Sequence, residues 1–339
     1  MRAYQILPGD NIDGLQCVDA TQRELANGEV RIRVHAVSLN YRDLMVASGN
    51  YLVNVDNPIV PCSDGAGEVL AVGHGVTRVQ VGDRVAASFF PYWQDGRTSP
   101  SKIRHALGGD IDGMLAEEVV LHEDALAKIP PQLSHVEACT MPCAGVTAWN
   151  AIFESSNGIR PGDTVLLLGT GGVSVLGLQL AQAAGLRTII TSSSDEKLER
   201  AQALGAHHTI NYRSMPEWQD EVLRVTHGMG ADVVLEVGGQ GTVGRSVAAA
   251  AMGGSVAIIG GVSGFGGEIN PVTLLGGAKR LVGIFVGSRL MLEQVMRFAA
   301  TSGIKPVVDR VFHFDQAKEA YRYMESGAHF GKVVISMTA

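Results

Sequence analysis

The stretch from Asp163 to Gly185, D-T-V-L-L-L-G-T-G-G-V-S-V-L-G-L-Q-L-A-Q-A-A-G, decides the fold. Val165 to Leu168 form a short apolar run of the kind found in fully buried strands. A glycine-rich turn ends the run, and apolar residues then recur with helical spacing up to Gly185, which is typical of a glycine just beyond a helix. A strand, a glycine turn and a helix in this order predict the start of a dinucleotide-binding βαβ unit, in which the helix N-terminus faces a pyrophosphate.

The glycine turn departs in one position from the dinucleotide fingerprint G-x-G-x-x-G. Ser174 stands where the third glycine would be, and serine is small enough to allow close packing of the helix on the strand. A tight turn in an α/β protein that binds no nucleotide is the alternative interpretation. The residues of this turn that we predict to contact a cofactor are Gly169, Gly171, Gly172 and Val173.

Composition limits the class of protein. The chain has 339 residues, of which 46% are hydrophobic and 18% charged, so we expect two domains with substantial cores and no extensive disorder. The net charge of −7 is unfavourable for binding nucleic acid. The four cysteines show no C-x-x-C pair, and no apolar run approaches the length of a membrane span. We therefore expect a cytoplasmic protein without a nucleic-acid or membrane partner.

The first part of the chain, to about residue 125, has the patterns of a strand-rich region. The strands expected there are Val30–Val37, Glu68–Gly73, Gly82–Ala86 and Met114–Val120. The polar segment from Pro91 to Asp112 predicts an exposed loop. Ser134 and Glu137 have the spacing of a capping box that opens a short helix, and a second helix is expected from Met141 to Glu154.

After Gly185, strands and helices alternate with the spacing of βαβ units. The strands expected are Thr188–Thr191, His208–Asn211, Asp232–Val237, Ser255–Gly260 and Leu281–Val286. With Val165–Leu168 they make six parallel strands, as in a doubly wound nucleotide-binding sheet. The elements expected at the end of the chain are a helix at Arg289–Ser302, a strand at Val307–Phe312, a helix at Phe314–Ser326 and a strand at Gly331–Ser336.

Six landmarks in a fixed order carry a family resemblance. They are Leu39-Asn40-Tyr41-Arg42-Asp43, the segment Pro61–Val69, Val81–Val85, Ala144–Trp149, the glycine turn and Gly331–Val334. This ordered set resembles the medium-chain dehydrogenase/reductase superfamily over nearly the whole chain. The resemblance implies an α/β protein with a GroES-like, β-rich catalytic domain, formed by residues 1–144 and 288–339. It also implies a Rossmann dinucleotide-binding domain with a six-stranded parallel sheet at residues 145–287.

The resemblance also bears on zinc. In zinc alcohol dehydrogenases of this superfamily a Cys and a His ligate the metal at the positions of Asn40 and Ser63, and only Cys143 falls where a third ligand stands. One thiol and two neutral oxygens are a poor site for an ion that prefers thiolate and imidazole. The four-cysteine structural zinc lobe is missing as well, because no cysteine lies between Cys62 and Cys139. We predict a protein without zinc.

The zinc-lacking branch of the superfamily includes NADPH:quinone oxidoreductases, the zeta-crystallin-like proteins, and enoyl reductases. The string Leu39–Asp43 is similar to one in the enoyl reductase domains of polyketide and fatty-acid synthases. The resemblance therefore implies hydride transfer to a quinone or an α,β-unsaturated carbonyl, whose oxygen needs a hydrogen-bond donor before a proton follows. An alcohol dehydrogenase with an unusual metal site at Cys143 is one alternative. A dinucleotide-binding protein with a structural or RNA-binding role is another, although the acidic charge counts against RNA.

The candidate catalytic residues follow from the same string. Tyr41 is the candidate proton donor, and Asn40 is a candidate for orienting the substrate carbonyl or the nicotinamide ribose. Asp43 is a further catalytic candidate. The alternative roles are a half-buried tyrosine at a strand end, an asparagine in a turn, and an aspartate paired with a nearby arginine such as Arg42 or Arg84.

The dinucleotide type is predicted from the end of the second expected strand. NAD-dependent proteins carry an acidic residue about 20 positions after the glycine turn, where it binds the ribose 2′-hydroxyl. The resemblance places Ser192 there, followed by Ser193, so we predict NADP(H); Arg213 is a further candidate contact of its 2′-phosphate. A capping box formed by Ser193 and Glu196 is an alternative explanation of these residues. The other predicted cofactor contacts are Thr147, Lys197, Tyr212, Gly238, Gly260, Phe285 and Val286.

The sixth expected strand, Leu281–Val286, is apolar and would lie at the edge of the sheet. An exposed apolar edge strand is normally covered. We therefore predict a homodimer in which this strand pairs with its copy in a second subunit.

Overall fold

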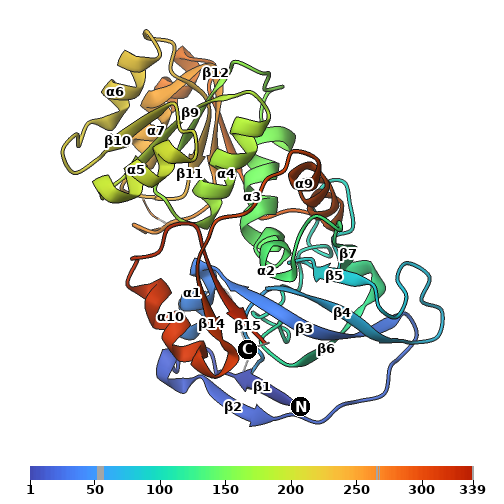
Figure 1. The fold of residues 1–339 in the computed structure, drawn as a ribbon. Coiled ribbons are helices and arrows are strands. Elements are labelled where there is room, and N and C mark those ends of the chain that lie inside the picture. Colours follow the sequence, from blue (N-terminus) through green and yellow to red (C-terminus); the bar gives the residue numbers. More distant parts are fainter. Residues whose placement is uncertain (52–56, 265, 267, 338–339) are drawn as a thin grey trace. The chain divides into compact units, whose positions relative to one another are not determined.

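The chain folds into two compact units in a computed structural model that describes residues 1–51, 57–264, 266 and 268–337. Unit 1 comprises Met1–Val146 and Gly287–Ala339, and unit 2 comprises Thr147–Val286 (Figure 1). The C-terminal segment therefore completes the first unit, whereas the second is one continuous stretch of chain. Among the described residues, no helix has both the length and the apolar composition needed to cross a membrane.

Unit 2 is built on a parallel sheet with the strand order β10-β9-β8-β11-β12-β13 (Figure 1). The strands are β8 (Thr164–Leu167), β9 (Arg187–Ser192), β10 (His208–Asn211), β11 (Ala231–Glu236), β12 (Ala250–Ile258) and β13 (Arg280–Gly283). The connecting helices are α4 (Gly172–Ala183), α5 (Asp195–Ala203), α6 (Trp218–Val225), α7 (Val243–Ala249) and α8 (Pro271–Gly276). Because the first strand lies in the centre and the order reverses beside it, the sheet is doubly wound. The predicted Rossmann sheet is confirmed.

The central strands are buried on both faces, which explains their uninterrupted apolar sequences. All four residues of β8 are buried, and so are five of the six residues of β11. The sixth strand was predicted to reach Val286 but ends at Gly283. Val286 has a φ of 53°, a left-handed conformation that an extended strand cannot contain.

Unit 1 contains an antiparallel-rich sheet with the order β14-β15-β3-β4-β5-β7, and β6 also pairs with β3. The strands are β3 (Glu29–Leu39), β4 (Asp64–Val72), β5 (Arg84–Ala87), β6 (Glu118–His122), β7 (Leu126–Lys128), β14 (Val308–His313) and β15 (Lys332–Ser336). A separate pair is formed by β1 (Arg2–Gln5) and β2 (Gln16–Asp19). Since β15 pairs with β3 in the register Val333 opposite Leu39, the end of the chain lies against the start of the landmark string.

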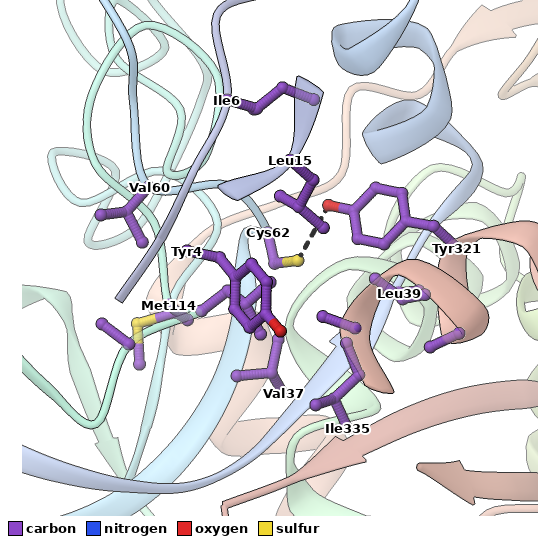
Figure 2. Packing of buried hydrophobic residues seen from close by; sticks show 14 of the residues in the cluster. Tyr4, Ile6, Leu15, Val37, Leu39, Val60, Cys62, Met114, Tyr321 and Ile335 are labelled. Atoms are coloured by element: carbon purple, nitrogen blue, oxygen red, sulfur yellow. Dashed lines mark hydrogen bonds between the residues drawn. The ribbon is translucent and has the colours of Figure 1, made fainter. Parts of the chain in front are cut away.

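The helices of unit 1 include α1 (Tyr41–Ala47), α2 (His135–Ala138), α9 (Arg289–Thr301) and α10 (Ala317–Glu325). The predicted helix at Met141–Glu154 forms as two wide π-helical turns, Met141–Gly145 and Asn150–Glu154, around α3 (Val146–Trp149). The Ser134–Glu137 capping box is confirmed by both of its hydrogen bonds. Figure 2 shows the main core of this unit, where the thiol of Cys62 lies 3.2 Å from the hydroxyl of Tyr321.

Two predictions for unit 1 were wrong in part. The strand predicted from Met114 starts only at Glu118, because Met114 donates its N–H to Cys62 O at 2.8 Å instead of joining a ladder. The segment from Pro91 to Asp112 is irregular as expected, but it is not an exposed loop throughout. Trp93 and Leu107 within it are buried, so this segment covers part of the core.

Candidate functional site

The glycine turn of unit 2 has the geometry of a dinucleotide-binding loop. Gly169 has a φ of 71°, which favours glycine, and Gly171 is the N-cap of α4. No heavy atom lies within 4 Å of the point where a Cβ would stand on Gly169 or Gly171, so the backbone there faces open space. Ser174 replaces the third glycine and donates its hydroxyl to Leu168 O at 2.6 Å, which ties the helix to the strand. These residues fit a bound pyrophosphate at the start of α4.

Several predicted cofactor residues lie together at the carboxyl edge of the sheet. Gly169 follows β8, Ser192 ends β9, Gly238 follows β11 and Gly260 follows β12, and neighbouring strands of this sheet are parallel. The Gly169 N–H donates to the hydroxyl of Thr191 at 3.2 Å, which links the glycine turn to β9. In doubly wound sheets this edge is where ligands bind.

A buried carboxylate holds the loop after β11. Glu236, fully buried, ends that strand, and its Oε1 accepts hydrogen bonds from Gly238 N–H at 2.7 Å and Gly239 N–H at 2.8 Å. The hydroxyl of Thr242 donates to the same oxygen at 2.6 Å, and Ser246 donates to Oε2. The conformation of the Gly238–Gly239 loop is therefore fixed by the side chain of the residue that precedes it.

The serines after β9 are arranged differently from the predicted capping box. Ser194, not Ser193, is the N-cap of α5, and its hydroxyl accepts from Lys197 N–H at 3.3 Å. The capping box at Ser193 is therefore wrong by one residue, because β9 continues to Ser192. The buried hydroxyl of Ser192 accepts from Ser194 N–H at 3.3 Å. Asp195, the first residue of α5, accepts from Asn211 Nδ2 at 2.6 Å.

The remaining predicted cofactor residues fall into two groups. The first comprises Tyr212, Lys197 and Arg213, and the second comprises Val286, Thr147 and Phe285. Tyr212 adjoins Ser192, since its N–H donates to Ser192 O at 3.0 Å, and its side chain is 41% exposed. Val286 is held by Asn150, whose Nδ2 donates to Val286 O at 2.7 Å. The other residues of this group are Thr147, which is buried, and Phe285, which is half exposed. In the first group Lys197 is partly buried on α5, and Arg213 is exposed beside Tyr212.

The landmark string of unit 1 forms a capped helix start. Asn40 is the N-cap of α1, and its backbone N–H donates to Asp43 Oδ2 at 2.7 Å. Tyr41 is the first residue of the helix and is 47% exposed, whereas Asn40 and Asp43 are buried. The strand-end position considered for Tyr41 is therefore wrong. Asp43 has a definite structural role in this cap, and its carboxylate also lies 3.4 Å from Arg42 Nη1.

Around this helix start lies a buried cluster of charges. Burial raises the pKa of Asp43 to about 6 even though the Arg42 guanidinium opposes the shift. Burial also raises the pKa of Asp64, which the charge of Lys332 opposes. Asp64 accepts from the hydroxyl of Ser63 at 2.7 Å and from Cys143 N–H at 3.1 Å.

The side chains at the positions of zinc ligands do not fit a zinc ion. Asn40 Oδ1 accepts from the ammonium of Lys332 at 2.6 Å, and a cation bound there repels a second cation. The Ser63 hydroxyl donates its hydrogen bond to Asp64 Oδ1. Burial, and after it the nearby Asp64 carboxylate, raise the pKa of the Cys143 thiol, whereas zinc binds the thiolate. Within the described part of the chain, no three His, Cys, Asp or Glu side chains are grouped as metal ligands.

The roles of two residues in these sites were not predicted from the sequence. Glu236 ends an apolar strand, and Lys332 begins one, so each resembles the polar boundary of a strand. In the structure both side chains are buried, at 0% and 2% exposure. A single charge that adjoins an apolar run was the only available signal, and it does not distinguish a solvated strand end from a buried one.

Comparison with known proteins agrees with this architecture. Residues 26–131 match the family of alcohol dehydrogenase GroES-like domains, and residues 172–301 match the family of zinc-binding dehydrogenases. The chain is 45% identical over 344 residues to a zinc-type alcohol dehydrogenase-like protein of Schizosaccharomyces pombe, with 99% of each chain covered.

Solved structures show the same relationship. An NAD-dependent alcohol dehydrogenase is 35% identical, with a TM-score of 0.90 and coverage of 99% of this chain and 100% of that one. A quinone oxidoreductase of Pseudomonas syringae is 28% identical, with a TM-score of 0.83 and 99% of each chain covered. The resemblance seen in the sequence landmarks is thus confirmed, and the chain belongs to the medium-chain dehydrogenase/reductase superfamily of oxidoreductases.

Proposed function

We propose that this protein is an NADPH-dependent, zinc-independent reductase that transfers hydride to a quinone or an α,β-unsaturated carbonyl compound. The observation that carries the proposal is that side chains at the zinc-ligand positions bind neighbouring residues: Asn40 binds Lys332, and Ser63 binds Asp64. A conjugated acceptor can be reduced with hydrogen bonds to its oxygen, whereas reduction of a simple aldehyde gains more from a Lewis acid. The similarity to a quinone oxidoreductase supports the same choice.

In this proposal the two units are the catalytic and dinucleotide-binding domains predicted at residues 1–144 with 288–339 and at residues 145–287. The dinucleotide supplies hydride when it is bound. The N-terminus of α4 and the backbone at Gly169 and Gly171 bind its pyrophosphate. Asn40 orients the carbonyl, and the exposed phenol of Tyr41 donates a proton.

The test is NADPH oxidation with quinones, enones, enoyl thioesters and aldehydes, in the presence of a chelator. We expect turnover of a quinone or a conjugated carbonyl that the chelator does not reduce, together with less than stoichiometric zinc in the purified protein. Tyr41→Phe should lower kcat at least about 100-fold because it removes the proton donor, whereas Tyr92→Phe, at another exposed tyrosine of unit 1, should not.

Two outcomes would argue for other functions, and a third would change only the mechanism. Turnover of aldehydes that is lost with the chelator would favour the alcohol dehydrogenase named among the relatives. Tight NADPH binding without turnover of any class would favour a binding protein. Full activity of Tyr41→Phe would remove Tyr41 from the mechanism while leaving the reductase proposal intact.

The preference for NADPH is a separate prediction, supported by the serine at the end of β9. Ser192→Asp should shift the ratio of kcat/KM for NADPH to that for NADH towards NADH by at least about tenfold, because a carboxylate repels the 2′-phosphate and binds the ribose hydroxyls. Ser192→Ala is the matched control and should keep the preference for NADPH. Equal kcat/KM values for the two cofactors in the unaltered protein would contradict the prediction.

A homodimer through the edge of the unit 2 sheet is also proposed. β13 is the last strand on its side, and the exposed side chains of Val272 and Leu275 lie on the helix that precedes it. Light scattering should therefore give twice the chain mass of 35.8 kDa. Leu275→Lys should produce monomers, and Met215→Lys, on the side of the opposite edge strand β10, should not. A monomeric mass for the unaltered protein would exclude the dimer.

A further inference from the structure

A lysine is buried at the point where β15 meets the start of α1. Lys332 is 2% exposed, and its ammonium donates to Leu39 O and to Asn40 Oδ1, both at 2.6 Å. No salt bridge joins it to a carboxylate among the described residues, although its charge acts on the nearby Asp43 and Asp64 carboxylates. Burying an ammonium without an ion pair costs several kcal/mol in general. A chain that keeps such a group has a use for its charge or for its hydrogen bonds.

The ammonium determines which way the amide of Asn40 points. An ammonium group only donates hydrogen bonds, so the atom of Asn40 that faces it must be the oxygen. The amide nitrogen, Nδ2, consequently points away from Lys332. Asn40 is 7% exposed, and Nδ2 is a buried donor without a hydrogen-bond partner in the described parts of the chain.

The backbone of Asn40 is fixed as well. Its N–H donates to Asp43 Oδ2 at 2.7 Å, and it lies at the N-cap of α1. The residue is therefore held at its backbone and at its amide oxygen, while its buried amide nitrogen has no hydrogen-bond partner of normal geometry among the described residues. A buried donor without an acceptor costs about 1–3 kcal/mol, which is recovered when a ligand supplies the acceptor.

Asp64 lies close enough for the Asn40 side chain to lower its pKa, but Nδ2 makes no hydrogen bond of normal geometry to it or to any other described residue. Asp64 is hydrogen bonded to Ser63 and Cys143, and Asp43 to the backbone of Asn40 itself. The bond from Lys332 withdraws electron density from the amide oxygen, and hydrogen bonds in such a chain strengthen one another. The amide N–H of Asn40 is thus a stronger donor than that of an ordinary asparagine.

We propose that Asn40 Nδ2 binds the substrate carbonyl or quinone oxygen, and that Lys332 is the positioning residue that orients and polarises it. This inference rests on the proposed reductase function. When hydride adds to the β-carbon of an enone, the C=C π bond breaks and the electron pair moves to the carbonyl oxygen. The enolate oxygen is held by the N–H of Asn40, and the phenol of Tyr41, the proposed donor, then gives a proton to the α-carbon. Asn40 and Lys332 are unchanged by the reaction, and they take over the carbonyl activation that a metal ion performs elsewhere.

A binding probe tests the inference without catalysis. We would titrate the protein, saturated with NADP⁺, with 4-nitrophenolate at a pH where the phenol is ionised, as a stand-in for the enolate oxygen. Asn40→Asp is the main variant, because its carboxylate forms an ion pair with Lys332 and preserves the fold while it removes the donor. We expect phenolate binding to weaken at least about 30-fold and NADP⁺ binding to change less than about twofold.

The role of Lys332 requires a second comparison. Lys332→Met should weaken phenolate binding about tenfold and lower kcat more than it raises KM, because the amide of Asn40 loses its orientation. In an Asn40→Leu background the same change should have no further effect, since Lys332 acts only through Asn40. Lys279→Met, which also removes an ammonium bonded to a backbone carbonyl, is the matched control in unit 2 and should leave phenolate binding unchanged.

The outcomes separate this inference from the proposed function. Reduction of enones by the unaltered protein together with unchanged phenolate binding and unchanged kcat in Asn40→Asp would overturn the inference and leave the function standing. Loss of phenolate binding in Asn40→Asp and Lys332→Met, in a protein that reduces no substrate of the panel, would support the oxyanion site and exclude the reductase. Equal effects of Lys332→Met in the two backgrounds would overturn the positioning role.

Discussion

We expect Glu236→Leu to lower the free energy of unfolding by about 4 kcal/mol and to weaken NADPH binding at least tenfold. Glu236 is fully buried and accepts hydrogen bonds from the backbone of Gly238 and Gly239 and from two hydroxyls. Hydroxyls can turn to other acceptors, but the two backbone N–H groups cannot. Leucine would leave both of these partly buried groups without their partner, and the loop after β11 would lose the contact that fixes it.

Glu236→Gln is the informative control for this position. Its amide oxygen can take the place of Oε1 and keep the three donors there, while its amide nitrogen faces Ser246. The serine hydroxyl can reverse its role and accept, because it carries both a proton and lone pairs. We expect a loss of no more than about 1 kcal/mol for this variant.

Urea denaturation and titration with NADPH measure the two effects. If glutamine and leucine destabilise the protein equally, the negative charge of Glu236 matters more than its hydrogen bonds, and the argument from unsatisfied donors is wrong. If both variants keep the stability of the unaltered protein, the Gly238–Gly239 loop is held by other contacts. A large loss of stability without a change in NADPH binding would show that this loop does not contact the cofactor.

The sequence predicts the unit 2 sheet well because its signals are local. Each signal indicates one kind of element: a strand at Val165–Leu168, a turn at the glycines that follow, and a helix end at Gly185. The later strands are separated by the spacing of βαβ units. The end of β13 was misplaced because Val286 adopts a left-handed backbone, which no local pattern of apolar residues indicates. Its conformation accompanies a contact with Asn150, which is 136 positions away in sequence.

The candidate site could be predicted only in part, for a related reason. Asn40 and Asp43 are neighbours in sequence, and their capping interaction is a local one. The contact of Asn40 with Lys332 spans 292 positions and exists because β15 pairs with β3. Lys332 and Glu236 both lie at the ends of strands that have neighbours on each side, and only the strand order shows that such ends are buried.

Below neutral pH we expect the protein to lose about 2 kcal/mol of stability through a stacked histidine pair. His35 on β3 and His135 at the start of α2 have their rings 4.4 Å apart and nearly parallel, at 14°. Burial lowers the pKa of His135 to about 4, and the neighbouring His35 lowers it further in the same direction. Burial also lowers the pKa of His35. Both side chains are partly exposed, so solvent screens part of the effect.

The direction of the effect follows from proton binding. Between about pH 6.5 and pH 4 the unfolded chain binds a proton at His135 that the folded protein does not bind, so unfolding becomes easier as the pH falls. Arg33 and Arg84 disfavour a charge on His35, while Glu68 favours it. Asp43 acts in the opposite direction over part of this range, because its raised pKa makes the folded state bind a proton near pH 6. The histidine contribution must therefore be measured as a difference between variants.

His135→Phe is the matched variant, since a phenyl ring keeps the stacking on His35 and cannot be protonated. Urea midpoints of this variant and of the unaltered protein should be compared at pH 7 and at pH 4.5, which lies below the ordinary pKa of histidine. We expect the difference in unfolding free energy between the two proteins to shift by about 2 kcal/mol in favour of the variant on going to the lower pH. A difference that stays constant with pH would mean that His135 has the same proton affinity in the folded and unfolded states. In that case the burial of the stacked pair would not control the acid stability of unit 1.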